Sequence, residues 1–410
     1  MMRSKRPGAA LAISAALAMA WPGLASSQQK EVKMAVVAPL SGPWARAGEM
    51  MRQGAELAVE DINRAGGIKA MGGAKARLIV ADAGDTPEKA RNAAQRLLAE
   101  HPDLVGGTGA WLSSFTLAVT EMTERAGLPW LANSFSDQIT DRGFTHVFQT
   151  GPTAAKLAEL SLATTVDMAT KAGGTAPGTI GLITENTAAP LGMLKTMREK
   201  EFARNRLKVV LDEVYTPPLS DATSLVQRVR SSRPDLLLVL ATGIQDNKLL
   251  IEKLNEFGLG RNRLPLLVLG AQAAAPEFVR LLGKDLTRGT MAIFSVWPTK
   301  DHAALVSRFK EKYKEPWMGQ DPMWSYGDIW LLKQALEDAG SSDREKVTAA
   351  LRGMDLKDGP AAFYTGNRVR FDEKGRRLDA GAVIVQWQNA MPVLVYPPDQ
   401  AVAEPEWIRK

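Results

Sequence analysis

The stretch with the clearest chemical capacity is Gly-Gly-Thr-Gly-Ala-Trp-Leu-Ser-Ser, residues 106–114. It follows a short apolar run and precedes a segment of helical periodicity that begins at Phe115. This order predicts a strand, a glycine-rich turn and then the N-terminus of a helix. Free backbone N–H groups and the positive end of the helix dipole meet at such a point, beside the hydroxyls of Ser113 and Ser114. The stretch is therefore a candidate site for a small anion, and a carboxylate is the best match.

The residue types that most enzymes need are scarce or badly placed. Cysteine is absent, which excludes a thiol nucleophile and a disulfide framework. Three histidines are available, none beside a suitable partner in the sequence: His101, His146 and His302. A catalytic triad or a histidine-rich metal site therefore has little support. No phosphate-loop lysine motif, no G-x-G-x-x-G after a strand and no G-x-S-x-G elbow occurs. We expect no enzyme, no cofactor and no metal site.

Two carboxylates, Asp82 and Asp85, are close enough in sequence to act as a pair. Residues of this type before a helix more often serve as caps and turns, and we expect that role here.

Acidic and basic residues are nearly balanced over the whole chain. The net charge of +6 falls to +3, with 48 basic against 45 acidic residues, when the three basic residues of segment 1–27 are removed. This balance gives no argument for a nucleic-acid partner.

The N-terminal segment, residues 1–27, has the pattern of a secretory signal peptide. A basic start over 1–6 precedes an apolar run over 9–20, and small residues suited to cleavage end at Ser27. A membrane anchor would need about 20 apolar residues, and this run is shorter. We therefore expect an exported, soluble protein.

Strands and helices alternate from residue 31 onward. Apolar runs predict strands in a first unit at 32–38, 77–82, 104–105 and 128–132, with helices over 49–65 and 87–100. The pattern restarts with a helix over 154–171 and strands at 179–184, 208–212, 235–241 and 265–270. Such alternation requires crossover connections and a mostly parallel sheet. The chain of 410 residues is long enough for two such units.

The last third of the chain is mixed. It holds a strand-like run at 290–297, helical patterns over 302–313 and 325–339, and three segments typical of antiparallel strands at 368–371, 382–386 and 393–396. This part is too small to form a domain by itself. We expect it to complete the first two units, so that the chain crosses between them more than once.

Several short motifs in the first unit carry a resemblance to a known family. The main ones are Met-Ala-Val-Val-Ala-Pro-Leu-Ser-Gly-Pro at 34–43, Gly-Ala-Glu-Leu-Ala-Val-Glu-Asp-Ile-Asn at 54–63, the stretch 106–114 and the segment 127–134. On these residues the chain resembles the leucine/isoleucine/valine-binding protein family, the type I periplasmic solute-binding proteins of ABC importers. The similarity runs from about residue 31 to 396, and it is most specific up to Ser136.

The resemblance implies an α/β fold of two Rossmann-like lobes with parallel-rich sheets, joined by three crossings, with the ligand enclosed between them. The first lobe would comprise about 28–152 and 297–362, and the second about 153–296 and 363–410. The resemblance also implies a monomer in the periplasm whose partners are a small-molecule ligand and the membrane permease of an ABC importer.

Amino-acid binders of this family hold the ligand carboxylate in the first lobe. They use a serine hydroxyl at the third strand-to-helix turn, and a hydroxyl with backbone groups after the fourth strand. The resemblance assigns these roles to Ser113, with Ser114 beside it, and to Ser134, Phe135 and Ser136. A plain helix N-cap is the alternative role for Ser113 or Ser114, and one side chain can serve both roles.

The positions that would hold the ligand ammonium depart from the family pattern. The family's tyrosines fall at or near Ala47, Ala189 and Gly243, and its acidic residue falls near Gln272. A neutral amide at the last position would remove the charge that favours an α-ammonium. This departure predicts a ligand that is a carboxylate without an amine, or an amide.

Aromatic residues near the predicted pocket loops could form its apolar walls: Trp44, Trp111, Phe135, Trp297 and Trp324. Core packing is the alternative role for each of them. A ligand sensor of the same fold, which binds acids or amides without transport, is a second interpretation of the whole chain. The predicted signal peptide argues against a cytoplasmic regulator. A secreted α/β hydrolase is a third, and it would need the nucleophile elbow that the sequence lacks.

Overall fold

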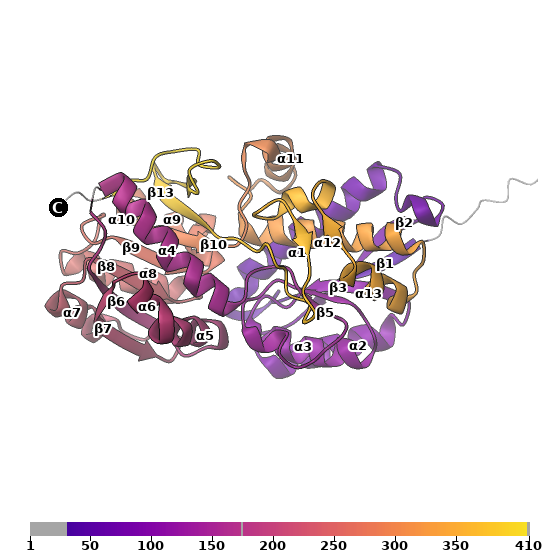
Figure 1. Ribbon diagram of the computed structural model, residues 1–410, viewed down its shortest axis with the longest axis horizontal. Helices are drawn as coiled ribbons and strands as arrows, with labels where there is room; N and C mark the ends of the chain where they lie inside the picture. Colours follow the sequence, from indigo (N-terminus) through magenta and orange to yellow (C-terminus); the bar gives the residue numbers. More distant parts are fainter. Residues whose placement is uncertain (1–30, 174, 408–410) are drawn as a thin grey trace, which may run out of the picture.

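The computed structural model describes residues 31–173 and 175–407, so the predicted signal peptide lies outside the described residues. Figure 1 shows two lobes side by side, each a β-sheet with helices on both faces. The chain passes between the lobes after β5 (Val147–Gln149), after β10 (Met291–Phe294) and after β12 (Val369–Arg370). The expected fold of two α/β lobes joined by three crossings is confirmed.

The first lobe is built on a parallel sheet in the order β2-β1-β3-β4-β5. Its remaining strands are β1 (Glu31–Ala38), β2 (Lys75–Asp82), β3 (Leu104–Gly109) and β4 (Trp130–Ala132). One face packs against α1 (Ala45–Arg64), α12 (Gln320–Ala339) and α13 (Arg344–Arg352), and the other against α2 (Pro87–Glu100) and α3 (Ser113–Arg125). Both faces are covered because side chains alternate along each strand. In β1, Met34 and Val36 enter one core, and Ala35 and Val37 enter the other.

The second lobe has a sheet in the order β14-β13-β10-β9-β8-β6-β7. Its parallel strands include β6 (Thr179–Glu185), β7 (Lys208–Tyr215), β8 (Leu236–Leu240) and β9 (Leu266–Leu269). The predicted antiparallel strands near the C-terminus form a hairpin of β13 (Val383–Gln388) and β14 (Met391–Tyr396) beside β10. Helices α4 (Ala154–Gly173) and α5 (Ala188–Thr196) cover one face, and α7 (Thr223–Ser232), α8 (Ile244–Glu256) and α9 (Pro276–Leu282) cover the other.

Gly106, Gly107 and Gly109 lie in strand β3, so the prediction that this glycine-rich segment forms a turn directly after residue 105 is wrong. A Cβ atom on Gly107 would lie 2.4 Å from the ring of Trp130, which packs directly on the strand. The strand therefore needs glycine for close packing. The turn comes later, where Gly109, Ala110 and Trp111 all have positive φ.

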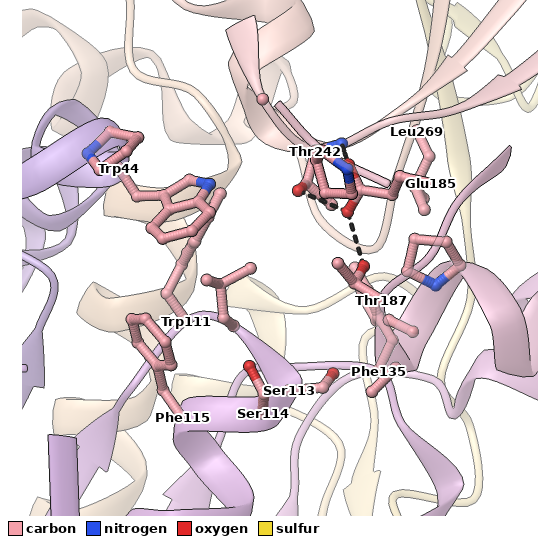
Figure 2. A pocket seen from close by; sticks show the side chains of 18 of the residues that line it. Trp44, Trp111, Ser113, Ser114, Phe115, Phe135, Glu185, Thr187, Thr242 and Leu269 are labelled. Atoms are coloured by element: carbon pink, nitrogen blue, oxygen red, sulfur yellow. Dashed lines mark hydrogen bonds between the residues drawn. The ribbon is translucent and has the colours of Figure 1, made fainter. Parts of the chain in front are cut away.

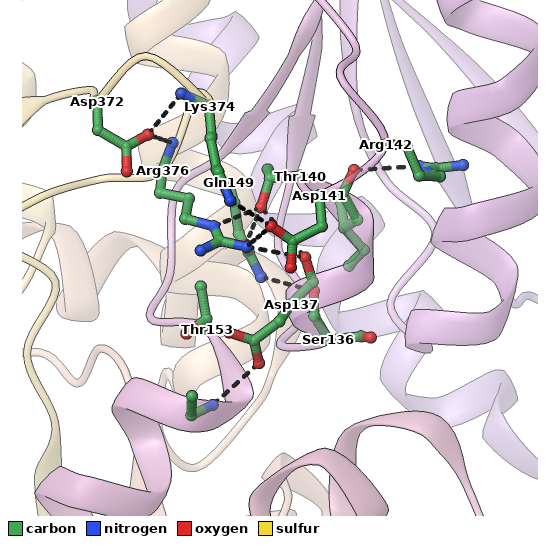
Figure 3. A network of polar contacts seen from close by, with 12 residues as sticks. Ser136, Asp137, Thr140, Asp141, Arg142, Gln149, Thr153, Asp372, Lys374 and Arg376 are labelled. Carbon is green, nitrogen blue, oxygen red and sulfur yellow. Dashed lines mark hydrogen bonds and ion pairs between the residues drawn. The ribbon is translucent and has the colours of Figure 1, made fainter. Parts of the chain in front are cut away.

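The segment after β12 returns along the edge of the first sheet. The backbone N–H of Gln149 donates to the carbonyl of Gly375 at 2.7 Å. The Arg376 guanidinium donates to the hydroxyl of Thr140 at 2.7 Å and pairs with Asp141 at 2.8 Å, as Figure 3 shows. The returning chain is thus tied to the first lobe before it enters the second sheet at β13. The residue boundaries of the lobes stay a prediction.

A loop of the first lobe also reaches into the second. It joins α11 (Ala303–Tyr313) to α12, and its Trp317 is buried in the core of the second lobe. The indole N–H of Trp317 donates to the carbonyl of Ala274 at 2.8 Å, and the ring meets Trp387 edge to face at 5.7 Å. Beside this loop, Arg46 of α1 pairs with Glu277 of α9 at 2.9 Å. Non-covalent contacts therefore add to the three covalent crossings.

Candidate ligand-binding site

A cavity of about 460 Å³ lies between the two lobes. The first lobe contributes the start of α3 and the residues that follow β4, and the second contributes the ends of β6, β8 and β9. Both sets lie at the carboxyl ends of parallel strands, where ligands of α/β proteins usually bind. The volume is within the range of small-molecule sites.

The N-terminus of α3 opens onto this cavity. Ser113 is the first residue of the helix, is only 5% exposed, and lines the cavity together with Ser114. The Ser113 hydroxyl oxygen accepts a hydrogen bond from the backbone N–H of Ser136 at 3.1 Å, and no side chain caps the helix. The N-cap role is therefore not adopted. Its hydroxyl proton and the first N–H groups of α3 are left for an anion.

Of the three predicted residues after β4, only Phe135 lines the cavity. Ser134 is buried, and its hydroxyl donates to the hydroxyl of Thr116 at 2.7 Å, inside the first lobe. Ser136 is also buried and acts on Ser113 through its backbone N–H. The structure thus brings Phe135 and Ser113 together, and the roles predicted for Ser134 and Ser136 in ligand binding stay predictions.

Aromatic rings form much of the cavity wall in the first lobe. Figure 2 shows Trp44, Trp111 and Phe115 on one side of the cavity, with Ser113 and Ser114 at its base. The Trp44 and Phe115 rings meet edge to face at 5.8 Å. Other predicted aromatic residues divide: Trp324 lines the cavity and lies 5.5 Å from Phe135, whereas Trp297 lines separate, smaller cavities. The site is suited to a ligand with an apolar body.

Gln272 does not reach the main cavity. It is buried and lines a separate cavity of about 20 Å³ beside Arg46 and Trp317. Among the other positions where the family pattern expects ammonium ligands, Ala189 and Gly243 line the main cavity and leave space there. A contact of Gln272 with ligand stays a prediction.

The second lobe supplies a carboxyl group that sequence reasoning missed. Glu185 ends β6, is 1% exposed, and lines the cavity opposite the aromatic wall. It accepts hydrogen bonds from the Thr187 hydroxyl at 2.6 Å and from the backbone N–H and hydroxyl of Thr242, each at 2.8 Å. Burial raises the pKa of Glu185 above its ordinary value, and these hydrogen bonds oppose the shift. Its place at the end of an apolar strand was the available signal.

The first lobe supplies another missed carboxyl group, Asp321, near the start of α12. It is 6% exposed, lines the cavity, and accepts a hydrogen bond from the indole N–H of Trp111 at 3.1 Å. Burial raises the pKa of Asp321 to about 7. The cavity is lined by acidic side chains of both lobes and by no lysine, arginine or histidine. Its electrostatic character is therefore acidic away from the α3 N-terminus.

The two carboxylates considered as a catalytic pair have structural partners. Asp82 accepts hydrogen bonds from the backbone N–H groups of Leu40 and Gly84, each at 2.8 Å, and Asp85 pairs with Lys89 at 2.7 Å. The expected turn role of Asp82 is confirmed. Across residues 31–173 and 175–407, no group of three or more acidic or histidine side chains could hold a metal ion. No helix in those ranges has the length and apolar character to cross a membrane.

Comparison with known proteins shows which family the chain belongs to. The sequence profile of a family described as "Periplasmic binding protein" matches residues 31–391. The chain belongs to this family. The family and the fold are those of solute-binding proteins rather than enzymes. Among curated relatives, "Leu/Ile/Val-binding protein homolog 8" of Brucella melitensis is 30% identical over 395 residues, which cover 91% of this chain and 92% of the relative.

Solved structures share the fold of this binding protein. A leucine-binding protein from Thermotoga maritima has a TM-score of 0.74 at 21% identity, covering 90% of this chain and 99% of its own. The LivJ protein of Streptococcus pneumoniae, in complex with isoleucine, has a TM-score of 0.74 at 18% identity, covering 89% and 100%. A solute-binding protein of an ABC transporter from Rhodopseudomonas palustris, in complex with 3,4-dihydroxybenzoic acid, has a TM-score of 0.72 at 18% identity, covering 92% and 99%.

Proposed function

We propose that this binding protein is the periplasmic substrate-binding component of an ABC importer and that it captures a small carboxylate-bearing solute. The observation that carries the proposal is the N-terminus of α3, where Ser113 and Ser114 open onto an apolar cavity between two lobes. A helix N-terminus favours an anion through its free N–H groups and its dipole. The aromatic wall would bury the body of the solute.

Closure of the lobes would couple this binding to transport. The solute favours the closed form only through contacts that it makes with both lobes. Glu185, Asp246 and Thr242 are among the polar residues of the second lobe that line the cavity. A membrane permease would then recognise the closed form. We further propose that the chain acts as a monomer in the periplasm after loss of its signal peptide, without catalysis.

The solute class is a branched-chain amino acid or a related organic or aromatic acid. Two of the proteins that share the fold were solved in complex with such molecules, isoleucine in one and 3,4-dihydroxybenzoic acid in the other. The cavity of about 460 Å³ with several aromatic rings supports a solute of either kind.

A thermal-shift panel of matched acids and alcohols tests the proposal. Leucine, 4-methylpentanoate and 3-phenylpropanoate would be compared with leucinol, 4-methylpentanol and 3-phenylpropanol. A ligand that binds only the folded state raises the melting temperature. We expect at least one acid to raise it in a dose-dependent way while its alcohol does not. Equal shifts from acid and alcohol, or stabilisation by no acid, would refute carboxylate capture at this site.

A further inference from the structure

The charged side chains that line the cavity are all acidic. Four acidic side chains line it, and three of them are well supplied with partners within the protein. Asp85 pairs with Lys89, Glu185 accepts three hydrogen bonds, and Asp246 accepts hydrogen bonds from the Tyr215 hydroxyl at 3.1 Å and the Leu219 N–H at 2.9 Å. The fourth, Asp321, is different.

Asp321 is buried with one of its oxygens unused. Its Oδ1 accepts the indole N–H of Trp111, and among the described residues its Oδ2 has no hydrogen-bond partner. Asp321 is among the residues that line the main cavity. Removing a carboxylate from water without a counter-charge is costly, which leaves this oxygen able to gain from a donor.

The nearest cation does not fill this role. Arg46 lies on α1, and its guanidinium is engaged by Glu277 at 2.9 Å and by Glu315 at 2.6 Å. It influences Asp321 only through its charge at longer range. Asp321 lines both the main cavity, which no cationic side chain lines, and the smaller cavity beside Arg46. Its carboxylate has no ion-pair partner among the described residues, and a ligand in the main cavity can bring a positive group to it.

We propose that Asp321 is the counter-ion for a positively charged nitrogen on the ligand. This inference rests on the proposed function and refines it: the solute carries a basic nitrogen in addition to its carboxylate. Amine recognition would then lie in the first lobe, on α12, and not at the second-lobe position that holds Gln272. The prediction of a ligand without an amine would be replaced.

The role of Asp321 predicts opposite pH dependences for two kinds of ligand. Because the pKa of Asp321 is about 7 in the free protein, a cationic nitrogen must bind the ionised form. Its affinity is full above pH 7 and falls as the pH falls below 7. A plain acid prefers the protonated form, so its affinity rises as the pH falls through 7.

Other titratable groups face the same space and require a variant to separate them. Glu185 and Asp246 face the cavity from the second lobe, and burial also raises the pKa of Glu185. Asp85 faces it from the first lobe and is paired with Lys89. The pKa of Arg46 is raised by its two carboxylate partners, so it stays charged. The Asp321→Asn variant isolates the contribution of Asp321, because the pH dependence of ligand affinity that is lost in this variant is due to Asp321.

Calorimetric titration of matched pairs between pH 5.5 and 8.5 tests the proposal. The pairs are leucine with 4-methylpentanoate and phenylalanine with 3-phenylpropanoate, which differ only by the amine. At pH 8 we expect the amine-bearing member of a pair to bind roughly 10- to 150-fold more tightly, the value of a hydrogen bond to a charged group. Asp321→Asn should remove most of that preference and flatten its pH dependence.

Asp328→Asn is the matched control. Asp328 lies on the same helix, and burial likewise raises its pKa to about 7. Its carboxylate instead accepts the hydroxyls of Thr108 at 2.5 Å and Tyr364 at 2.6 Å, away from the cavity. This variant should keep the full preference for the amine.

Two results would overturn the role of Asp321. The plain acids could bind the wild-type protein as tightly as their amine-bearing partners, or Asp321→Asn could keep the preference unchanged. In both cases acids still bind, so the proposed function survives. If no carboxylate-bearing probe binds better than its alcohol, the proposed function itself fails.

Discussion

Replacement of Trp317 by alanine should loosen the two lobes from each other. Trp317 belongs to a loop of the first lobe but is 7% exposed, because its ring is buried in the core of the second lobe. The loop itself is held on the first lobe by α11, whose Arg308 pairs with Asp61 of α1 at 2.7 Å. The side chain therefore acts as an anchor across the cleft, beside the covalent crossings.

The expected size of the effect follows from the contacts of this side chain. Truncation of a buried tryptophan to alanine costs about 3–5 kcal/mol of stability. Of this, about 1 kcal/mol corresponds to the hydrogen bond from the indole N–H to the carbonyl of Ala274. The edge-to-face contact with Trp387 contributes a further 0.5–1.5 kcal/mol, roughly. The loss falls on the contact between lobes, so their relative motion should increase.

Two measurements check this expectation. Denaturant unfolding gives the stability loss, and energy transfer between dyes on the two lobes gives the distribution of their separation. The chain has no cysteine, so Arg96→Cys on α2 and Lys208→Cys on β7, both exposed positions, supply the two labels. We expect Trp317→Ala to broaden the distribution in the absence of ligand.

Trp130→Ala is the matched control, because Trp130 is fully buried within the first lobe. It should cost a similar amount of stability without broadening the separation of the lobes. An unchanged distribution in Trp317→Ala, or equal broadening in both variants, would refute the anchor.

Three further predictions follow from single contacts. Glu277→Gln removes the partly exposed ion pair with Arg46 across the cleft. The free energy of unfolding should therefore change by less than about 1 kcal/mol, while the separation of the lobes widens at low salt. An unchanged separation would contradict this. The melting temperature of Asp328→Asn should rise relative to that of the wild-type protein as the pH increases from 5 to 8. Burial raises the pKa of Asp328 to about 7, so its ionisation destabilises the wild-type fold as the pH rises toward and through 7; a constant difference would contradict this. Gly54→Ala should destabilise by about 1–3 kcal/mol in denaturant unfolding, because its Cβ would lie 2.1 Å from the carbonyl oxygen of Pro322 on α12; a neutral variant would contradict this packing.

Local sequence patterns predicted most of the fold. The alternation of strands and helices was visible because buried parallel strands read as apolar runs, as in Leu236–Leu240. Short or glycine-rich strands were missed because they do not form such an apolar run. Strand Val147–Gln149 has only three residues, and Gly106 and Gly107 read as a turn although Trp130 and α12 press on them in the sheet. Tertiary packing decided those positions, and the local pattern does not record it.

The candidate site divides in the same way. Ser113 and Ser114 were found because the features that mark them, a strand followed at once by a helix, are adjacent in the sequence. Asp321 was missed because its partner Trp111 is 210 residues away, and because the helix was predicted to begin only at residue 325, after Asp321. Glu185 faces the cavity only because β6 ends at the cleft. Contacts between residues far apart in the sequence therefore set the part of the site that the sequence did not reveal.

The most direct test of the account is the affinity of Ser113→Ala for the carboxylate-bearing probe that binds the wild-type protein most tightly. The substitution removes one hydrogen bond to a charged ligand group and should weaken binding roughly 10- to 150-fold in a calorimetric titration. Thr116→Val, one turn further along α3 and away from the cavity, controls for disturbance of the helix and should bind as the wild-type protein does. Affinity unchanged by Ser113→Ala would contradict the claim that the N-terminus of α3 holds the carboxylate.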